Sequence, residues 1–424
     1  MNEKKRKLRN QKCKRGILRI AYIVICFIFL CRNHLVLANL EDNEKINLLE
    51  IKETVIQTVN TKGNEPKINS RIAVIYDRAS GKVMYGKNEN KQTPMASTTK
   101  ILTSIVVIEN SNLADIVTVD GKAAGTGGSR LGLKKNDKIT VHDLLYGLML
   151  CSGNDAAVAL ANYVGGSVEG FSKMMNQKAE ELGLTNSHFV VPHGLDMEKH
   201  YTTAYELAKM ADYALNIKKI KEIVGTKTYT VTINGKPRII SNTNELLGNL
   251  NGVYGVKTGF TNGAGRCLVT SCKRDELDII TVVIGADTKK IRTTDSIALI
   301  EYAYKNYQLV DVKEKLKEQF EEWKRLNQNR IVIEKGVKSN IELEIEELNY
   351  EKMAIKNTQV DNIHIEINSL YYFEAPVEKH RLIGNIKIML NDKVIDVLPM
   401  YNQKEIEKKQ IKHYMLDFLK IVNG

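Results

Sequence analysis

Cysteine is scarce in this chain of 424 residues, which has six Cys in all. Only Cys151, Cys267 and Cys272 lie beyond residue 38, and this small, odd number argues against a disulfide scaffold. The eight histidines are scattered without the close Cys/His spacing of a metal site, so we expect no metal and no cofactor. An ordinary apolar core must hold the fold, and a chain that is 43% hydrophobic is long enough for two or three domains.

Beyond residue 38, the chain has almost no excess of positive charge. The net charge is +12, but residues 1–38 contain ten Lys and Arg against one Glu. The remainder has 52 basic and 49 acidic residues and is therefore nearly balanced. A basic surface that could bind nucleic acid is not indicated, and we expect no nucleic-acid partner.

The first 38 residues have the pattern of an export signal. A basic segment from Lys4 to Arg19 precedes an apolar run from Ile20 to Cys31. Val36-Leu37-Ala38 then fits the small-residue pattern at which signal peptides are cleaved. The run of about 12 residues is short for a spanning helix, which needs about 20, so an uncleaved anchor is the weaker alternative. We predict a signal peptide over 1–38 and an exported protein, at the extracytoplasmic face of a bacterial cell membrane or in the cell wall.

The order of the expected elements indicates an α+β fold. A polar linker over 39–70 leads to a domain over 71–308 that opens with a hairpin and has a helical centre. Strands return late in this domain, so the hairpin and these strands can share one antiparallel sheet beside a helical cluster. The expected helices are 141–150, 156–164, 168–182 and 294–304, and the expected strands are 71–76, 82–85, 253–257, 266–271 and 277–284.

Ser97-Thr98-Thr99-Lys100 precedes an apolar run that predicts a helix. Residues three apart share a helix face, about 5 to 6 Å apart at Cβ, so Ser97 and Lys100 can touch. This pair predicts a nucleophilic hydroxyl beside a lysine that takes its proton. Such a role requires Lys100 to be neutral for part of the time, which burial or a second cation such as Lys257 would favour. The alternative is an N-capping serine with a lysine in solvent.

Two further motifs follow in the chain. Ser152-Gly153-Asn154 lies between two expected helices and could project a hydroxyl and an amide, although taken alone it is a turn with an N-cap. Lys257-Thr258-Gly259 lies on an expected strand whose edge could pair with a peptide and bind its carboxylate; alone it is a strand that ends in a glycine turn. Their joint order on helix, turn and strand, behind an export signal, favours a serine acyl-transfer site without histidine.

The chain from about Arg71 to Tyr307 resembles the low-molecular-mass, serine-type D-alanyl-D-alanine carboxypeptidases of peptidase family S11. This resemblance implies a β-lactamase/DD-peptidase-like catalytic domain. The stretches that carry it are Pro94–Ile101, Gly128–Leu133, Leu150–Ala157, His193–Asp196, His200–Ala204, Asn242–Leu247 and Gly255–Thr261.

The resemblance also implies a role for each site residue. Ser97 would be the acylated nucleophile and Lys100 the general base. The other implied roles are proton relay and amide binding for Ser152 and Asn154, carboxylate binding for Lys257 and Thr258 at the strand edge that Gly259 opens, and oxyanion binding by the N–H groups of Ser97 and Phe260. Arg292 is a further candidate for binding the carboxylate, because it is basic and follows the last expected strand. His193 and His200 are expected to be structural.

The implied reaction is removal of the terminal D-alanine from peptidoglycan pentapeptide stems through an acyl-enzyme. β-Lactam antibiotics would acylate the same serine. Three alternatives stay open: a β-lactamase, a DD-endopeptidase that differs only in substrate size, and a non-catalytic penicillin-sensing domain. The first is disfavoured because the sequence has no clear Glu-x-x-Leu-Asn segment and has a further β domain.

The last third of the chain predicts three more parts. The charged segment over 309–330 is expected to connect the domains, and the period-two pattern over 331–402 predicts a small all-β domain like the C-terminal one of these carboxypeptidases. There His380 stands where Gly is usual, so the local turn is expected to differ. Over 403–424 an amphipathic helix is expected, with Lys404 to Val422 either on a membrane surface or packed on the β domain.

Overall fold

A five-stranded antiparallel sheet forms the centre of the first domain in the computed structural model, which describes residues 45–61 and 65–423. The predicted signal peptide, 1–38, lies outside the described residues. Strand β1 pairs with β9, which places Ile72 opposite Ile284 and joins the early hairpin to the late strands. The order of the strands is β2 (Val83–Lys87), β1 (Ile72–Asp77), β9 (Leu277–Ala286), β8 (Gly265–Arg274) and β7 (Val253–Thr261).

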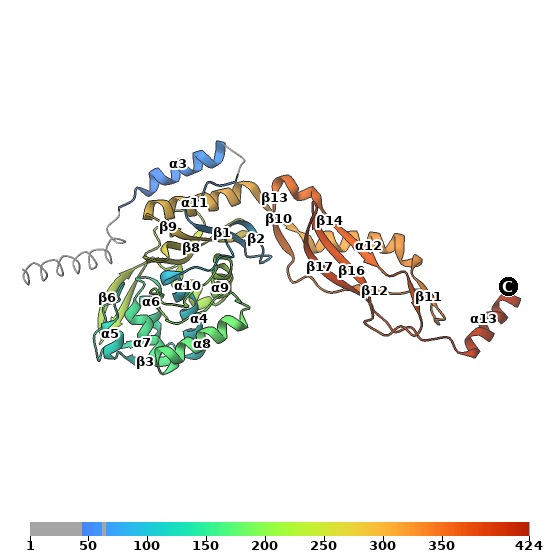
Figure 1. Ribbon diagram of the computed structural model, residues 1–424, viewed down its shortest axis with the longest axis horizontal. Helices are drawn as coiled ribbons and strands as arrows, with labels where there is room; N and C mark the ends of the chain where they lie inside the picture. The colour runs from blue at the N-terminus through green and yellow to red at the C-terminus, as the bar shows by residue number, and fades with distance from the viewer. Residues whose placement is uncertain (1–44, 62–64, 424) are drawn as a thin grey trace, which may run out of the picture.

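Helices cover both faces of this sheet (Figure 1). Alternate residues of the strands face opposite ways, so Val74 belongs to the core under the helical cluster and Ile75 to the core under α11. Cys267 and Cys272 divide between the two cores in the same way, and both are free thiols. The helical cluster contains the 3-10 turn η1 (Ala96–Thr99), α4 (Lys100–Asn110), α5 (Gly121–Gly125), α6 (Val141–Met149), α7 (Asn154–Gly165), α8 (Val168–Glu181), α9 (Ala204–Asn216) and α10 (Lys218–Val224).

The opposite face carries α11 (Lys289–Asn306), and α3 (Leu48–Thr61) packs on the outer side of α11. Helix α3 corrects the expectation of a linker over 39–70. Ile51 and Val55 are spaced by one helical turn and are buried with residues of α11, so this part of the segment is a packed element. Two small two-stranded sheets, β3 (Ile116–Thr118) with β4 (Lys138–Thr140) and β5 (Thr228–Ile233) with β6 (Lys236–Ser241), complete the domain.

The second domain is a small β structure covered by one helix. Helix α12 (Val312–Asn327) buries Leu316 and Phe320 against the strands, so the charged segment 309–330 is part of this domain and not only a connection. A four-stranded sheet has the order β12 (Leu343–Ile345), β17 (Lys393–Asn402), β16 (Leu382–Leu390) and β14 (Ile363–Ser369). The remaining strands are β10 (Tyr307–Asp311) with β13 (Lys352–Lys356), and β11 (Val332–Glu334) with β15 (Tyr372–Glu374); the 3-10 turns are η2 (Gln328–Arg330) and η3 (Asn357–Asn362).

Polar contacts join the two domains. The buried carboxylate of Asp77, at the end of β1, accepts a hydrogen bond of 2.9 Å from the backbone N–H of Ala354 in β13. Lys82 forms an ion pair of 2.8 Å with Asp396 in β17. The first domain is therefore fastened to the second at the end of β1 and in the turn directly before β2.

The C-terminal part of the second domain shows two further features. His380 has φ +58°, so the turn there adopts the left-handed conformation that favours glycine. Helix α13 (Ile411–Asn423) begins later than Lys404 and projects from the end of the molecule farthest from the first domain (Figure 1). Among the described residues, no helix is long and apolar enough to cross a membrane.

Candidate active site

Ser97 and Lys100 meet at the start of α4. Ser97 lies in η1, directly before the helix, and the fully buried amine of Lys100 lies 2.8 Å from Ser97 Oγ. The same amine lies 2.7 Å from Asn154 Oδ1 and 2.8 Å from the carbonyl oxygen of His193. Burial disfavours a charged amine, and two acceptors, Asn154 Oδ1 and the carbonyl oxygen of His193, hold this one beside the serine hydroxyl. The structure therefore brings together a hydroxyl and a lysine in the geometry of an activated nucleophile.

Strained backbone presents the serine. Ala96, directly before Ser97, has φ +50°, a conformation that non-glycine residues seldom adopt. Gly194 packs on this turn so closely that a Cβ there would lie 1.9 Å from the carbonyl oxygen of Ala96. Glycine at 194 is therefore required by the close approach of the two segments.

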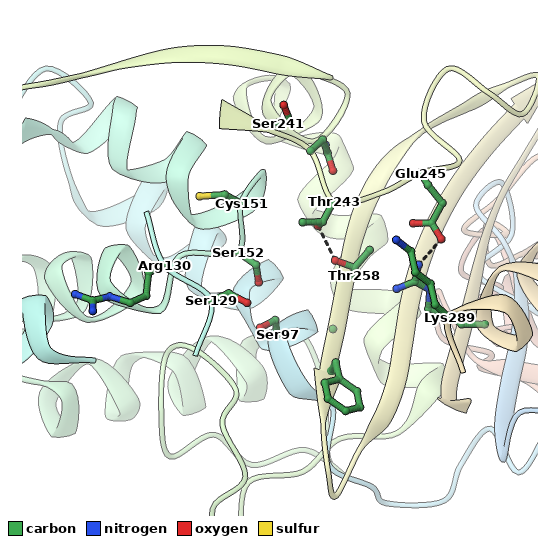
Figure 2. Close-up of a pocket in the computed structure, with 14 residues that line it drawn as sticks. Ser97, Ser129, Arg130, Cys151, Ser152, Ser241, Thr243, Glu245, Thr258 and Lys289 are labelled. Atoms are coloured by element: carbon green, nitrogen blue, oxygen red, sulfur yellow. Dashed lines mark hydrogen bonds and ion pairs between the residues drawn. The ribbon is translucent and has the colours of Figure 1, made fainter. Parts of the chain in front are cut away.

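Ser152 and Asn154 come from the turn between α6 and α7. Ser152 has φ +59°, and Asn154 is the first residue of α7. The Asn154 amide group donates to the carbonyl oxygen of Gly127 at 2.7 Å, which orients its oxygen toward Lys100. The second motif therefore meets the first through Asn154, while Ser152 lines the same pocket as Ser97 (Figure 2).

Strand β7 carries the third motif and is the outer strand of the sheet on the side of the nucleophile. A Cβ at Gly259 would lie 3.0 Å from the backbone nitrogen of Ser97, so glycine permits this contact. Lys257 and Thr258 are buried, and the Lys257 amine donates to the carbonyl oxygen of Thr258 at 3.0 Å. Phe260 follows at the edge of the pocket, with the Arg266 guanidinium 4.7 Å from its ring centre.

A cavity of about 410 Å³ unites the motifs. Of the predicted site residues, Lys100, Asn154 and Lys257 are buried beside its wall and do not line it. The predicted residues that do line it are Ser97, Ser152, Thr258, Gly259, Phe260 and Arg292. Polar side chains dominate the wall, which suits a peptide with a charged end (Figure 2).

Arg292 reaches the cavity from α11 and is nearly fully buried. Its guanidinium forms an ion pair with Glu245, and the same carboxylate oxygen accepts a hydrogen bond of 2.5 Å from Thr293. Burial works against the charged carboxyl of Glu245, but Arg292 and these hydrogen bonds outweigh it and lower the pKa of Glu245. The charge of Arg292 is therefore partly balanced before any substrate enters.

The two histidines near the site do not contact Ser97 directly. Burial, then the charge of Lys100, lowers the pKa of His193 to about 3; burial, then His188, lowers the pKa of His200 to about 4. The His200 ring accepts from the backbone N–H of Val190 and lies 2.9 Å from Thr99 Oγ1. Both rings are therefore neutral near pH 7, and their contacts support the loops around the nucleophile.

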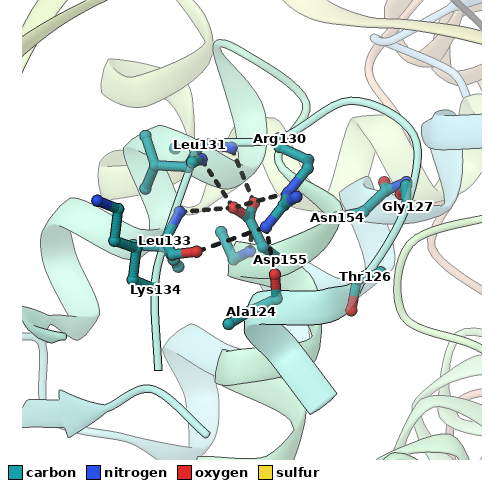
Figure 3. Close-up of polar contacts among 12 residues, drawn as sticks. Ala124, Thr126, Gly127, Arg130, Leu131, Leu133, Lys134, Asn154 and Asp155 are labelled. Carbon is teal, nitrogen blue, oxygen red and sulfur yellow. Dashed lines mark hydrogen bonds and ion pairs between the residues drawn. The ribbon is translucent and has the colours of Figure 1, made fainter. Parts of the chain in front are cut away.

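Two wall segments were not given a role by sequence reasoning. The first is the loop 127–133, which carries Ser129 and Arg130 and which the buried carboxylate of Asp155 holds (Figure 3). Asp155 accepts hydrogen bonds from the N–H groups of Leu131, Gly132 and Leu133 at 2.7 to 2.9 Å. The second is the segment 242–245, in which Thr243 Oγ1 lies 2.6 Å from Thr258 Oγ1. Both segments lie in stretches of the sequence that resemble the family, and this resemblance was the one indication that they could belong to the site.

The described residues contain no cluster of His, Cys, Asp or Glu that could hold a metal ion. Cys151 borders the cavity, but burial, then the charge of Asp155, raises the pKa of its thiol to about 11, and the thiol donates to the carbonyl of Gly147. A thiolate nucleophile is therefore disfavoured at this site.

Comparisons with known proteins agree with this geometry. Residues 58–288 match the family model described as D-alanyl-D-alanine carboxypeptidase, and residues 320–408 match the C-terminal domain of penicillin-binding protein 5. The chain is 34% identical to the D-alanyl-D-alanine carboxypeptidase DacF of Bacillus subtilis, over 80% of this chain and 86% of that protein. It is 33% identical to the D-alanyl-D-alanine carboxypeptidase DacC of Escherichia coli, over 84% of this chain and 88% of that protein.

Solved structures show the same fold. The crystal structure of penicillin-binding protein 5 from Haemophilus influenzae is similar with a TM-score of 0.68 and 26% identity, over 81% of this chain and 99% of that chain. The crystal structure of the D-alanyl-D-alanine carboxypeptidase DacD from Francisella tularensis is similar with a TM-score of 0.67 and 26% identity, over 82% of this chain and 96% of that chain. The expected α+β domain followed by a small all-β domain is thereby confirmed.

Proposed function

This chain belongs to the D-alanyl-D-alanine carboxypeptidase family, and we propose that it removes the C-terminal D-alanine from peptidoglycan pentapeptide stems through an acyl-enzyme on Ser97. The observation that carries this assignment is the position of the Lys100 amine, 2.8 Å from Ser97 Oγ and 2.7 Å from Asn154 Oδ1. An amine buried at this distance can take the hydroxyl proton without a histidine.

Acylation follows from these contacts. Ser97 Oγ attacks the carbonyl carbon between the two D-alanines while its proton passes to the neutral amine of Lys100. The N–H groups of Ser97 and Phe260 stabilise the oxyanion, since β7 and η1 lie in contact at Gly259. The tetrahedral intermediate then expels D-alanine, whose nitrogen receives the proton from Lys100 through the Ser152 hydroxyl.

Deacylation uses the same groups in reverse. A water molecule gives its proton to Lys100 and attacks the acyl carbon, and the bond to Ser97 Oγ breaks as the serine regains a proton. Asn154 holds Lys100 in position through its Oδ1, and we propose its side chain as the group that binds a substrate amide. Lys257, Thr258 and Arg292 bind the terminal carboxylate, with the substrate backbone extended along the edge of β7.

β-Lactam antibiotics are the second ligand class that we propose for this site. A β-lactam carbonyl would be attacked by the same hydroxyl, and its carboxylate would lie at Lys257 and Thr258. A stable acyl-enzyme with D-alanine release favours the carboxypeptidase. Rapid turnover of penicillin would indicate a β-lactamase, labelling without D-alanine release a sensing domain, and cleavage only of cross-linked peptides an endopeptidase.

Mass spectrometry tests the assignment. The wild-type protein is incubated with penicillin and, separately, with a pentapeptide that ends in D-Ala-D-Ala. We expect one acyl group per protein and free D-alanine, and expect Ser97→Ala to give neither. Ser339→Ala, at an exposed serine of the second domain, is the matched control and should behave as wild type. Full labelling of the Ser97→Ala variant would exclude Ser97 as the nucleophile.

We also propose that the protein is exported and rests on the membrane surface through α13. The exposed residues of this helix include Ile411, Met415, Phe418 and Ile421, and basic residues accompany them, as an interfacial helix requires. Their exposure supports this interpretation over packing on the β domain. Deletion of residues 411–424 should then move the protein from the membrane fraction to the soluble fraction, and unchanged fractionation would refute the anchor.

A further inference from the structure

The segment 242–245 forms a wall of the cavity next to Thr258 (Figure 2). Its backbone is fixed on several sides. The N–H of Asn242 donates to the carbonyl of Lys227 at 2.8 Å, and the N–H of Thr243 donates to the carbonyl of Leu150 at 3.1 Å. The Asn244 side chain donates to the carbonyl of Gly255 in β7 at 3.0 Å. Thr243 is therefore held rigidly between the second motif and the third.

The hydroxyl groups of Thr243 and Thr258 form one unit. They lie 2.6 Å apart, and both residues line the cavity. Two hydroxyls have two protons, and a hydrogen bond between them uses one. Whichever threonine donates to the other, one O–H group stays available to a ligand. The pair can therefore donate to an anionic oxygen at this end of the cavity.

The neighbouring cation strengthens this argument. Arg292 lines the same end of the cavity, but Glu245 already forms an ion pair with its guanidinium. A carboxylate that enters therefore meets a cation whose charge Glu245 already partly balances. Uncharged donors beside it then contribute a larger share of the binding, and the two threonine hydroxyls are such donors.

We infer that Thr243 is a substrate-contacting residue that completes the subsite for the terminal carboxylate. This inference rests on the function proposed above and adds a residue that none of the three motifs contains. The Thr243 hydroxyl fixes the orientation of the Thr258 hydroxyl and shares the substrate carboxylate with it. The ligand class is a peptide with a free C-terminal carboxylate, and the subsite discriminates it from the same peptide with a C-terminal amide.

Binding to an inactive background isolates this contact. Ser97→Ala is combined with Thr243→Val or Thr243→Ser, and calorimetry measures the Kd of a peptide ending in D-Ala-D-Ala and of its C-terminal amide. Loss of a hydrogen bond to a charged group predicts about tenfold weaker binding of the acid with valine. For the amide we expect a change of no more than about threefold. Serine keeps the hydroxyl and should restore binding of the acid.

The matched control is Thr118→Val, at an exposed threonine of β3 that does not line the cavity. It should bind both peptides as the background does. The inference is overturned if Thr243→Val binds the acid normally, if it weakens acid and amide equally, or if Thr243→Ser fails as valine does.

Steady-state kinetics separate this inference from the function itself. In the active enzyme, Thr243→Val should raise KM for the pentapeptide about tenfold with kcat changed by less than about threefold. If the wild-type enzyme releases no D-alanine, the proposed function fails. If it releases D-alanine and Thr243→Val has an unchanged KM, only the role of Thr243 fails.

Discussion

Substitution of Asp155 by asparagine gives a direct test of how the loop 127–133 is held. Oδ1 accepts from the N–H groups of Leu131 and Ala156 at 2.8 and 3.0 Å, and Oδ2 accepts from those of Gly132 and Leu133 at 2.7 and 2.9 Å. Asparagine has nearly the same shape, but its NH₂ group must replace one of these oxygens. Two N–H groups then face a donor where they had an acceptor.

The expected cost follows from the bonds that are lost. A hydrogen bond to a charged group contributes about 1.5 to 3 kcal/mol, and two are removed. The loop is near the surface and can turn its N–H groups toward water, so we expect the lower end, a loss of about 3 kcal/mol in the free energy of unfolding. Ser129 and Arg130 line the cavity on this loop, so acylation by penicillin should also slow.

Urea unfolding measures the stability, and stopped-flow measures acylation. Hydrogen exchange of the amides at 131–133 should accelerate in the variant, while exchange in the second domain stays unchanged. Asp392→Asn, at an exposed carboxylate of the second domain, is the matched control. The reasoning is refuted if Asp155→Asn loses less than about 0.5 kcal/mol and these amides exchange as in the wild type.

Three further predictions concern other parts of the chain. The pKa of His200 is lowered to about 4 in the folded protein, whereas a histidine of the unfolded chain has a pKa near 6.5, so the unfolded chain binds the proton first as pH falls. The free energy of unfolding should therefore drop by about 2 kcal/mol from pH 6.5 to 5. Urea unfolding of His200→Gln should lack this contribution to the pH dependence. Gly194→Ala would place a Cβ 1.9 Å from the carbonyl oxygen of Ala96, so penicillin acylation should slow by about 100-fold; an unchanged rate would contradict the required close approach. Phe320→Ala, in the core under α12, should destabilise the second domain by about 3 to 5 kcal/mol in calorimetry while D-alanine release persists.

The sequence was most informative where short spacing decides geometry. Residues three apart share a helix face, so the spacing predicted that Ser97 and Lys100 can touch, as they do, while a lysine in solvent stayed open as the alternative. The sheet could be predicted because its strands have dense apolar runs. The pairing of β1 with β9 across some 200 residues was expected only from the order of the strands, and the role of each site residue needed the family resemblance.

The parts that sequence reasoning missed depend on long-range contacts or on weak patterns. Helix α3 has few buried positions, and without its partner α11 the segment looks like a polar linker. Helix α12 is so charged that its apolar stripe, with Leu316 and Phe320, was taken for a connection. Thr243 reaches the cavity only because Asn242 and Asn244 fasten its loop to distant segments, which no periodicity reveals.

The position of β7 at the border of the sheet also bears on self-association. An outer strand with free N–H and C=O groups can pair with the same strand of another molecule and start aggregation. Here η1 and α10 contact β7, and the segment 242–245 walls the cavity beside it. These neighbours cover part of the strand and limit its pairing with the edge of a second sheet. The same contacts that shape the cavity thus also reduce the exposure of an edge that could start aggregation.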